Sequence, residues 1–164
     1  MTTAAYRLRD ATPGDAHDLT DLFLAARRTA MPWLAVVHTD DETRGWITHA
    51  LLRDRRVRIA EADGRVAGFA VVHDGWLDHL YIAPAHQGTG AGSLLLDDSK
   101  RLSGGALQLY VFQRNQRARA FYLSRGFVEA AFSDGATNEE REPDLVMRWT
   151  IAVEEPGRPS SDRP

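Results

Sequence analysis

The sequence predicts one α/β (α+β) domain, with a central mixed, mostly antiparallel sheet of about six to seven strands flanked by about four helices. Three observations support this fold class. Apolar and polar residues alternate in short segments near both ends of the chain, Asp-Gly pairs divide its middle, and helical periodicity recurs between the strands. We expect the domain to cover residues 1–153 and the proline-rich, charged residues 154–164 to form a disordered tail.

The first elements are a strand and two helices. "YRLRDA" (6–11) alternates and is expected to be a strand. A helix then runs to about Ala30, with Thr12 as N-cap and Asp15 completing an approximate capping box. "MPWL" ends this helix, and Thr39 or Asp40 caps the next one.

The remaining elements follow from turn signals and periodicity. Asp-Gly pairs at 63–64 and 74–75 divide residues 56–83 into a three-stranded antiparallel meander, because both residues of such a turn can take positive φ. A glycine-rich corner and a helix to about Leu102 come next. They are followed by a strand "ALQLYVF", a helix "NQRARAFYLSR" and a closing hairpin made of "GFVEAAF" and "DLVMRWTIAV".

Composition excludes several classes of function. A net charge of −3 argues against a general nucleic-acid binder, and the absence of cysteine excludes disulfides, thiolate zinc sites and an acyl-cysteine mechanism. No apolar run approaches the length of a membrane span, and "MTTAAYRLRD" lacks the features of a signal peptide. We therefore expect a cytoplasmic protein without a metal, acting as a monomer or homodimer. One lysine against nineteen arginines suggests a GC-rich bacterial genome.

The corner "QGTGAG" (87–92) leads from a strand into an apolar helix and is expected to bind an anion. The first N–H groups of a helix lack partners within the helix, and glycine lets phosphate oxygens approach the backbone closely. A nucleotide P-loop requires Gly-Lys-Ser/Thr, which is absent. A dinucleotide fingerprint requires a third glycine where Ser93 stands, and a parallel βαβ unit in place of hairpins.

The same corner, after "LYIAP", resembles the coenzyme motif of the GNAT superfamily of N-acetyltransferases. A second GNAT-like segment follows at Asn115, Ala118, Phe121, Tyr122, Gly126 and Phe127. The resemblance implies a sheet splayed between its fourth and fifth strands and acetyl-CoA as co-substrate. It places the coenzyme at Leu80, Tyr81, Ile82, Gln87, Gly88, Thr89, Gly90, Ala91, Gly92 and Asn115.

The resemblance also implies direct acetyl transfer to a primary amine. Tyr122 matches the family tyrosine that can donate a proton to the departing thiolate, and a backbone N–H near Ile82 would polarise the acetyl carbonyl. Strand alternation places Asp78 on the face shared by Leu80 and Ile82, which makes Asp78 the candidate base. A structural role for this carboxylate, and His79 or water as the base, stay open.

The acceptor is expected to be a small cationic amine. Trp33, in the connection between the first two helices, is expected to border its pocket. The acidic loop 134–144, with Glu139 and Glu140, would attract an ammonium group. The alternatives are acetylation of protein N-termini or lysines, and a non-catalytic acyl-CoA-binding module.

Overall fold

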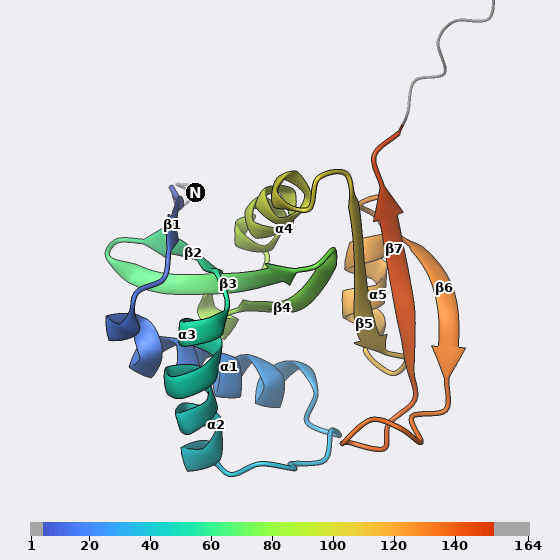
Figure 1. Ribbon diagram of the computed structural model, residues 1–164, viewed down its shortest axis with the longest axis horizontal. Helices are drawn as coiled ribbons and strands as arrows, with labels where there is room; N and C mark the ends of the chain where they lie inside the picture. Colours follow the sequence, from blue (N-terminus) through green and yellow to red (C-terminus); the bar gives the residue numbers. More distant parts are fainter. Residues whose placement is uncertain (1–4, 153–164) are drawn as a thin grey trace, which may run out of the picture.

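The computed structural model describes residues 5–152, so the predicted tail lies outside the described residues. The described residues form a sheet of seven strands in the order β1-β2-β3-β4-β5-β7-β6 (Figure 1). Among the strands of the described chain, only the β4–β5 pair is parallel, which confirms the predicted mixed, mostly antiparallel sheet. The strands are β1 Arg7–Asp10, β2 Val57–Ala62, β3 Arg65–His73, β4 Trp76–Ile82, β5 Ala106–Phe112, β6 Val128–Ser133 and β7 Asp144–Thr150.

The helices lie where the periodicity indicated. They are α1 Ala16–Ala30, α2 Asp40–Trp46, α3 Leu52–Asp54, α4 Ala91–Leu102 and α5 Gln116–Leu123, with short turns η1 Pro13–Asp15 and η3 Pro84–His86. A π-helical segment, η2 Ile47–Leu51, joins α2 to α3 without a break, so that these three segments act as one helix. None of the helices in residues 5–152 combines the length and apolar character needed to cross a membrane.

Both predicted helix starts carry capping boxes. The backbone N–H of Thr12 donates to Oδ2 of Asp15 at 2.7 Å, ahead of η1 and α1. At α2, Thr39 rather than Asp40 is the N-cap: its Oγ1 accepts from the N–H of Glu42 at 3.1 Å, and its own N–H donates to the Glu42 carboxylate at 2.8 Å. These bonds satisfy N–H groups that have no partner within the helix.

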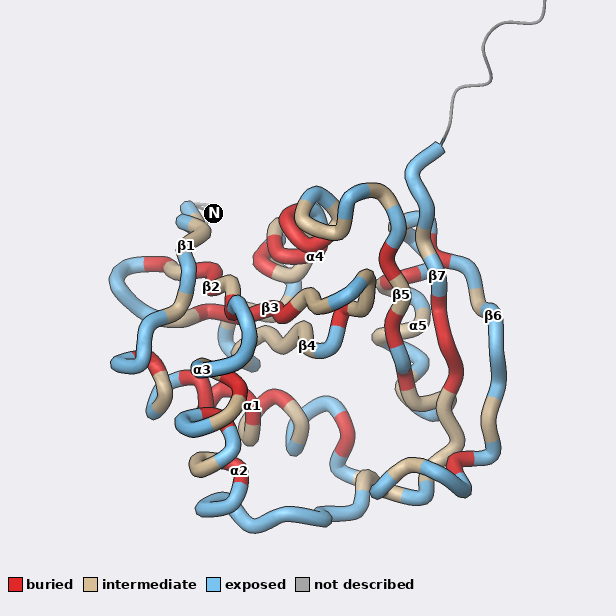
Figure 2. Tube along the Cα trace, in the orientation of Figure 1, coloured by how far each residue is buried: buried red, intermediate tan, exposed pale blue. Residues whose placement is uncertain are grey.

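Two apolar clusters lie on opposite faces of the sheet. On one face, α1 and η2 pack against a set of β2 and β3 residues that includes Ile59 and Phe69. On the other face, α4 and α5 pack against Ala60, Ala70 and the buried residues of β5 and β7. Figure 2 shows the buried segments in β2, β3, α4, β5 and β7, whereas the edge strand β6 is mostly exposed.

The sheet opens between β4 and β5. These strands pair only at Trp76 and Gln108, next to a hydrogen bond from the N–H of Gln108 to the Gly75 carbonyl at 3.0 Å. Beyond this point they diverge (Figure 1). The rest of β4 therefore pairs with β3 alone within the described chain, and a gap lies on its other side.

The predicted alternation of side chains along β4 is wrong at one point, because the strand has a β-bulge at Asp78. His79 pairs with Val71 and Leu77 with Val72, so Asp78 is an extra residue without a partner on β3. A bulge shifts the alternation by one residue. Leu77 consequently joins the cluster under α4, on the side of Leu80, whereas it was predicted on the opposite face.

Candidate active site

The glycine corner lines a cavity of about 320 Å³, here called the glycine cavity. Its walls come from α1, the end of β4, the corner with the start of α4, and α5. Its lining residues are Ala26, Ala30, Met31, Leu80, Tyr81, Ile82, His86, Gln87, Gly88, Gly90, Gly92, Ser93, Asn115, Arg117, Ala118, Phe121, Tyr122 and Arg125. The structure thus brings most of the sequence-predicted coenzyme residues to one cavity; Thr89 and Ala91 belong to the same corner but do not line it.

The corner leaves open space in front of the helix. Gly88 and Gly90 have positive φ, 72° and 94°, and a Cβ at either position would meet no atom within 4 Å. Gly90 is the N-cap of α4, so the unpaired N–H groups of the first turn face this space. Gly92 also lines the cavity, and a Cβ there would be in ordinary van der Waals contact with the ring of Phe121, at 3.5 Å. The geometry fits a phosphate group at the helix start.

Two arginines of α5 and the turn after it complete the glycine cavity, and the sequence patterns did not single them out. Arg117 donates from Nη1 to Oε1 of Gln87 at 3.1 Å. Arg125 donates to Oγ of Ser93 at 2.7 Å and lies over the ring of Phe121. Arginine is a preferred partner of phosphate. The signal that could have found them is two arginines inside the "NQRARAFYLSR" motif.

A hydrogen-bonded chain fixes the corner to β1. The hydroxyl of Tyr6 lies 2.6 Å from Oγ1 of Thr89 and 2.9 Å from Nδ1 of His86. Oγ1 of Thr89 also donates to the carbonyl of His86. Thr89 therefore supports the shape of the corner from behind, while its neighbours line the cavity.

The end of β4 turns backbone groups toward the gap. Ala83 donates its N–H to the carbonyl of Ala67, on the β3 side. Because backbone groups alternate in direction along an antiparallel strand, the N–H groups of Leu80 and Ile82 point away from β3 and toward β5. These donors can pair with an extended ligand lying in the gap.

Tyr122 lies on α5 at the inner wall of the glycine cavity. It is 8% exposed and packs edge-on against Phe121 and Phe127. Burial raises the pKa of Tyr122 well above its ordinary value, because the phenolate would lose its solvation. The phenol is therefore protonated throughout the neutral range and can act as a proton donor.

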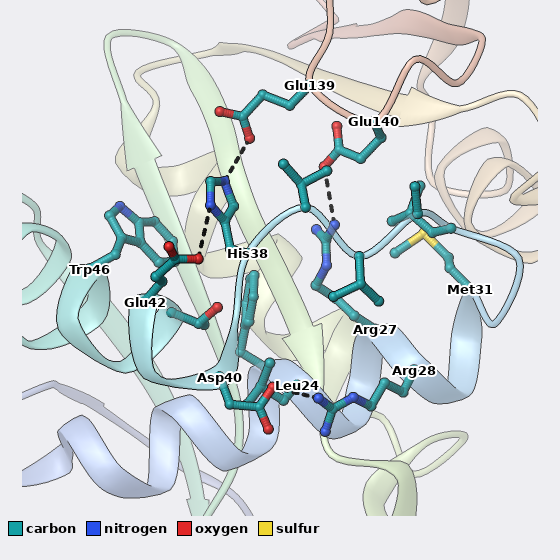
Figure 3. Close-up of a pocket in the computed structure, with 16 residues that line it drawn as sticks. Leu24, Arg27, Arg28, Met31, His38, Asp40, Glu42, Trp46, Glu139 and Glu140 are labelled. Atoms are coloured by element: carbon teal, nitrogen blue, oxygen red, sulfur yellow. Dashed lines mark hydrogen bonds and ion pairs between the residues drawn. The ribbon is translucent and has the colours of Figure 1, made fainter.

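A second cavity of about 480 Å³, here called the loop cavity, lies between α1, α2, the α1–α2 loop and the β6–β7 loop (Figure 3). Its lining residues are Phe23, Leu24, Arg27, Arg28, Met31, Leu34, Ala35, Val36, Val37, His38, Asp40, Glu42, Thr43, Trp46, Glu139 and Glu140. Met31 lines both cavities, which places them side by side. The predicted acceptor residues Glu139 and Glu140 are part of this wall.

The acidic loop is less free than its sequence indicated. Glu140 accepts from Nη2 of Arg27 at 3.3 Å, and Glu139 lies 3.0 Å from Nε2 of His38, as Figure 3 shows. Glu142 pairs with Arg114 at 3.3 Å. Each of these carboxylates has a cationic or titratable partner, so the field of the loop on an approaching ammonium is weaker than a count of carboxylates suggests.

Trp33 does not line either cavity. Its ring packs edge-on against Phe112 with a centroid distance of 6.1 Å, and the guanidinium of Arg114 lies 4.5 Å from its centroid. These contacts hold the α1–α2 loop against the end of β5. Met31 and Leu34, on either side of it in sequence, line the loop cavity in its place.

Asp78 also lies outside both cavity linings. It is exposed at the bulge, but the protein around it removes part of the solvation of its carboxylate, and this desolvation raises its pKa, with His73 and Arg55 acting in the opposite direction. His79 is more enclosed, between the rings of Phe23, Trp46 and Tyr81. Its Nδ1 has no hydrogen-bond partner among the described residues, and burial together with the positive charge of Arg27 lowers the pKa of His79 to about 4.

Known proteins with similar sequences include N-acetyltransferases, and the match covers the glycine corner described above. A profile of the acetyltransferase (GNAT) domain matches residues 53–129, from the end of α3 through the glycine corner to β6. The uncharacterized N-acetyltransferase Rv2669 of Mycobacterium tuberculosis is 37% identical over 102 residues, which cover 57% of this chain and 65% of that protein. The chain thus matches just under two thirds of the length of this relative.

Two further proteins match over more of their length. The peptidyl-lysine N-acetyltransferase YiaC of Escherichia coli is 26% identical over 147 residues, 88% of this chain and 97% of that protein. The crystal structure of the PaiA N-acetyltransferase of Thermoplasma acidophilum in complex with coenzyme A superposes with a TM-score of 0.70 at 18% identity, covering 90% of this chain and 99% of that one. These matches show that residues 53–129 carry an acetyltransferase (GNAT) domain, and that the described chain has the fold of the solved N-acetyltransferase.

Proposed function

We propose that this protein moves an acetyl group from acetyl-CoA directly to a primary amine of a small molecule. The observation that carries the proposal is the glycine cavity. It combines a helix start with open space over Gly88 and Gly90, two arginines, and the free edge of β4. The helix start and the arginines are suited to bind phosphates, and the free edge of β4 is suited to bind an extended amide chain. Coenzyme A contains both kinds of group.

Each part of the glycine cavity then has a task in binding. The backbone from Gln87 to Gly92, with Arg117 and Arg125, would hold the pyrophosphate. Leu80, Tyr81 and Ile82 would hold the pantetheine chain along the gap, and Asn115 lines the same wall while capping α5 through its contact with Ala118. The co-substrate supplies an activated acetyl thioester. The residues of the protein must bind this thioester and the amine and must move the protons of the reaction.

The chemistry needs a polarised carbonyl and a proton for the leaving group. The N–H of Ile82 points into the gap and can donate to the acetyl oxygen as negative charge develops there. Tyr122 holds a proton at its phenol oxygen and can deliver it to the departing sulfur. The amine forms the new C–N bond, the C–S bond breaks, and the amine's surplus proton leaves to a base. No cysteine is present to form an acyl-enzyme.

The positions of the candidate residues narrow the choice of the catalytic base. Asp78 was the sequence-based candidate, but it stands at the bulge outside both cavity linings. His79 also lines neither cavity, but its ring packs against Phe23 and Trp46, which line the loop cavity. It is neutral at physiological pH because its pKa is lowered. We propose that proton removal proceeds through water, with His79 as the nearer titratable group on β4.

A second candidate function is acetylation of peptidyl lysine, the activity for which YiaC is named. The loop cavity favours a small acceptor, because residues 31–38 and Glu139–Glu140 enclose it from two sides (Figure 3). A lysine on a protein surface needs an open groove instead.

A coenzyme-release assay with acetyl-CoA tests the proposal. The acceptors should include small primary amines, amino acids and lysine-containing peptides. Release with a small amine supports the proposal, and release with peptides alone supports the second candidate. If no acceptor releases coenzyme and free coenzyme A does not raise the melting temperature, the acetyltransferase assignment for this chain is overturned.

A further inference from the structure

Arg27 is a cation built into the wall of the loop cavity. It lies on the last turns of α1, its side chain is 25% exposed, and its guanidinium lies 5.2 Å from the centroid of the Phe23 ring. Nη1 donates to the hydroxyl of Tyr81 at 3.1 Å. Nη2 donates to Glu140 at 3.3 Å (Figure 3). A cavity meant for a purely cationic acceptor would not be expected to present an arginine.

The guanidinium has donors to spare. An arginine carries five N–H donors, and Arg27 uses two groups in the hydrogen bonds found among the described residues. Its bond to Glu140 is long and single, whereas arginine binds a carboxylate best through two parallel bonds. A second carboxylate, brought by a ligand, can therefore be accommodated.

Arg27 also stands where the two cavities meet. Its partner Tyr81 lines the glycine cavity, and Arg27 itself lines the loop cavity. A carboxylate bound to Arg27 would lie beside this boundary. An amine one carbon away from that carboxylate would then lie at the boundary as well, where an acetyl group on the coenzyme has to arrive.

The rest of the loop cavity is suited to an apolar group. Aromatic and aliphatic side chains form much of its wall: Phe23, Leu24, Met31, Leu34, Val36 and Trp46. A volume of about 480 Å³ leaves room for a bulky side chain. Glu139 and Glu140 on the β6–β7 loop provide negative charge in the same space.

We propose that the loop cavity takes an α-amino carboxylate with a bulky apolar side chain, whose carboxylate is bound by Arg27. This inference rests on the proposed function and names its substrate class. The acceptor is then a zwitterion, not the simple cation that the acidic loop alone suggested. Arg27 is a specificity-determining residue, because it distinguishes acceptors by a group that does not react.

The test separates binding from turnover. Isothermal titration would measure the affinity of L-phenylalanine, L-leucine and L-methionine, each against its own carboxamide and its decarboxylated amine. Titrations are run at neutral pH, where each amino acid is a zwitterion and its decarboxylated amine keeps the ammonium group but lacks the carboxylate. We expect each amino acid to bind about 10- to 100-fold more tightly than its amide, as for a charge-assisted hydrogen bond.

Variants assign this preference to one side chain. Arg27→Gln should remove the difference between amino acid and amide, and Arg27→Lys should restore part of it. The double variant Arg27→Gln/Glu140→Gln avoids leaving Glu140 without its partner. Arg53→Gln is the matched control, because Arg53 is 71% exposed and, among residues 5–152, pairs with its neighbour Asp54 alone.

The inference is overturned if none of the amino acids binds more tightly than its amide, or if Arg27→Gln weakens both equally. Coenzyme release is followed with the same acceptors. Release that is equally fast with amides or decarboxylated amines would leave the acetyltransferase function standing and remove the carboxylate requirement. Absence of release with every amine, without any effect of coenzyme A on stability, would instead remove the proposed function.

Discussion

Tyr6 and Thr89 are joined by a hydrogen bond of 2.6 Å between their hydroxyl oxygens, although 83 residues separate them in the chain. Tyr6 precedes β1 at the edge of the sheet, and Thr89 lies between the two glycines with positive φ. The first strand thus holds the corner in the shape that leaves the start of α4 open.

Tyr6→Phe should therefore weaken coenzyme binding without touching the coenzyme. Loss of the hydroxyl removes its hydrogen bonds with Thr89 and His86, and we expect about a 3- to 10-fold increase in Kd because the corner becomes less preorganised. Titration of the wild type and the variant with free coenzyme A measures the two Kd values. Tyr110→Phe is the control, since Tyr110 is exposed and stacks on Trp76. An unchanged Kd in Tyr6→Phe would show that the corner keeps its shape unaided.

Substitution of Gly90 can separate strain from charge. Gly90→Asn and Gly90→Asp are nearly isosteric, and both tolerate positive φ better than other residues. Only the aspartate places a negative charge where phosphate is proposed to bind, so its Kd for coenzyme A should exceed that of the asparagine variant about 10-fold or more at low salt. The difference should shrink as ionic strength rises. Equal affinities would place the pyrophosphate elsewhere.

Tyr122→Phe removes one oxygen from a buried side chain and keeps its packing. If Tyr122 donates the proton to the departing thiolate, kcat should fall about 10²- to 10⁴-fold while the Kd of coenzyme A changes little. Steady-state kinetics and a binding titration measure the two quantities. A variant with wild-type kcat would exclude Tyr122 as the acid of a rate-limiting chemical step.

His79 should make the protein less stable in mild acid. Its pKa is about 4 in the folded protein and about 6.5 when unfolded, so the unfolded chain takes up a proton first as the pH falls. The free energy of unfolding should decrease from pH 6.5 toward pH 4, by up to about 3 kcal/mol. His79→Gln should flatten this part of the curve, measured by urea unfolding. His17→Gln, whose side chain is 72% exposed, should not.

Asp78→Asn tests the base that strand alternation indicated. Because Asp78 lies at the bulge and outside both cavity linings, we expect the pH profile of kcat/KM to overlay that of the wild type. A shifted acid limb would restore Asp78 as the base. His79→Gln in the same assay shows whether the nearer side chain carries the limb instead.

Local signals in the sequence were sufficient for most elements. The Asp-Gly turns place positive φ at Asp63 and Asp74, and the capping boxes define where two helices begin. Each signal acts within a few residues, so it does not depend on the rest of the fold. The glycine corner is of the same kind.

What the sequence did not reveal depends on distant partners or on register. The bulge at Asp78 has no glycine or proline to mark it, and it changes which β4 residues share a face. The contact between Arg27 and Glu140 joins residues 113 positions apart, so the sequence pattern does not reveal that the charge of the acidic loop is partly neutralised. Trp33 was placed correctly in its connection, but its contact with Phe112 could not be read from local pattern.

The single point of pairing between β4 and β5 has a consequence for hydrogen exchange. Amides of Leu80 and Ile82 face the gap, so in the free protein they should exchange with solvent faster than the amides that β4 donates to β3. A ligand that pairs with this edge would slow exchange at alternate residues of one strand. Such alternating protection would show that the ligand pairs with β4 through backbone hydrogen bonds, in the place that a neighbouring strand would take in a continuous sheet.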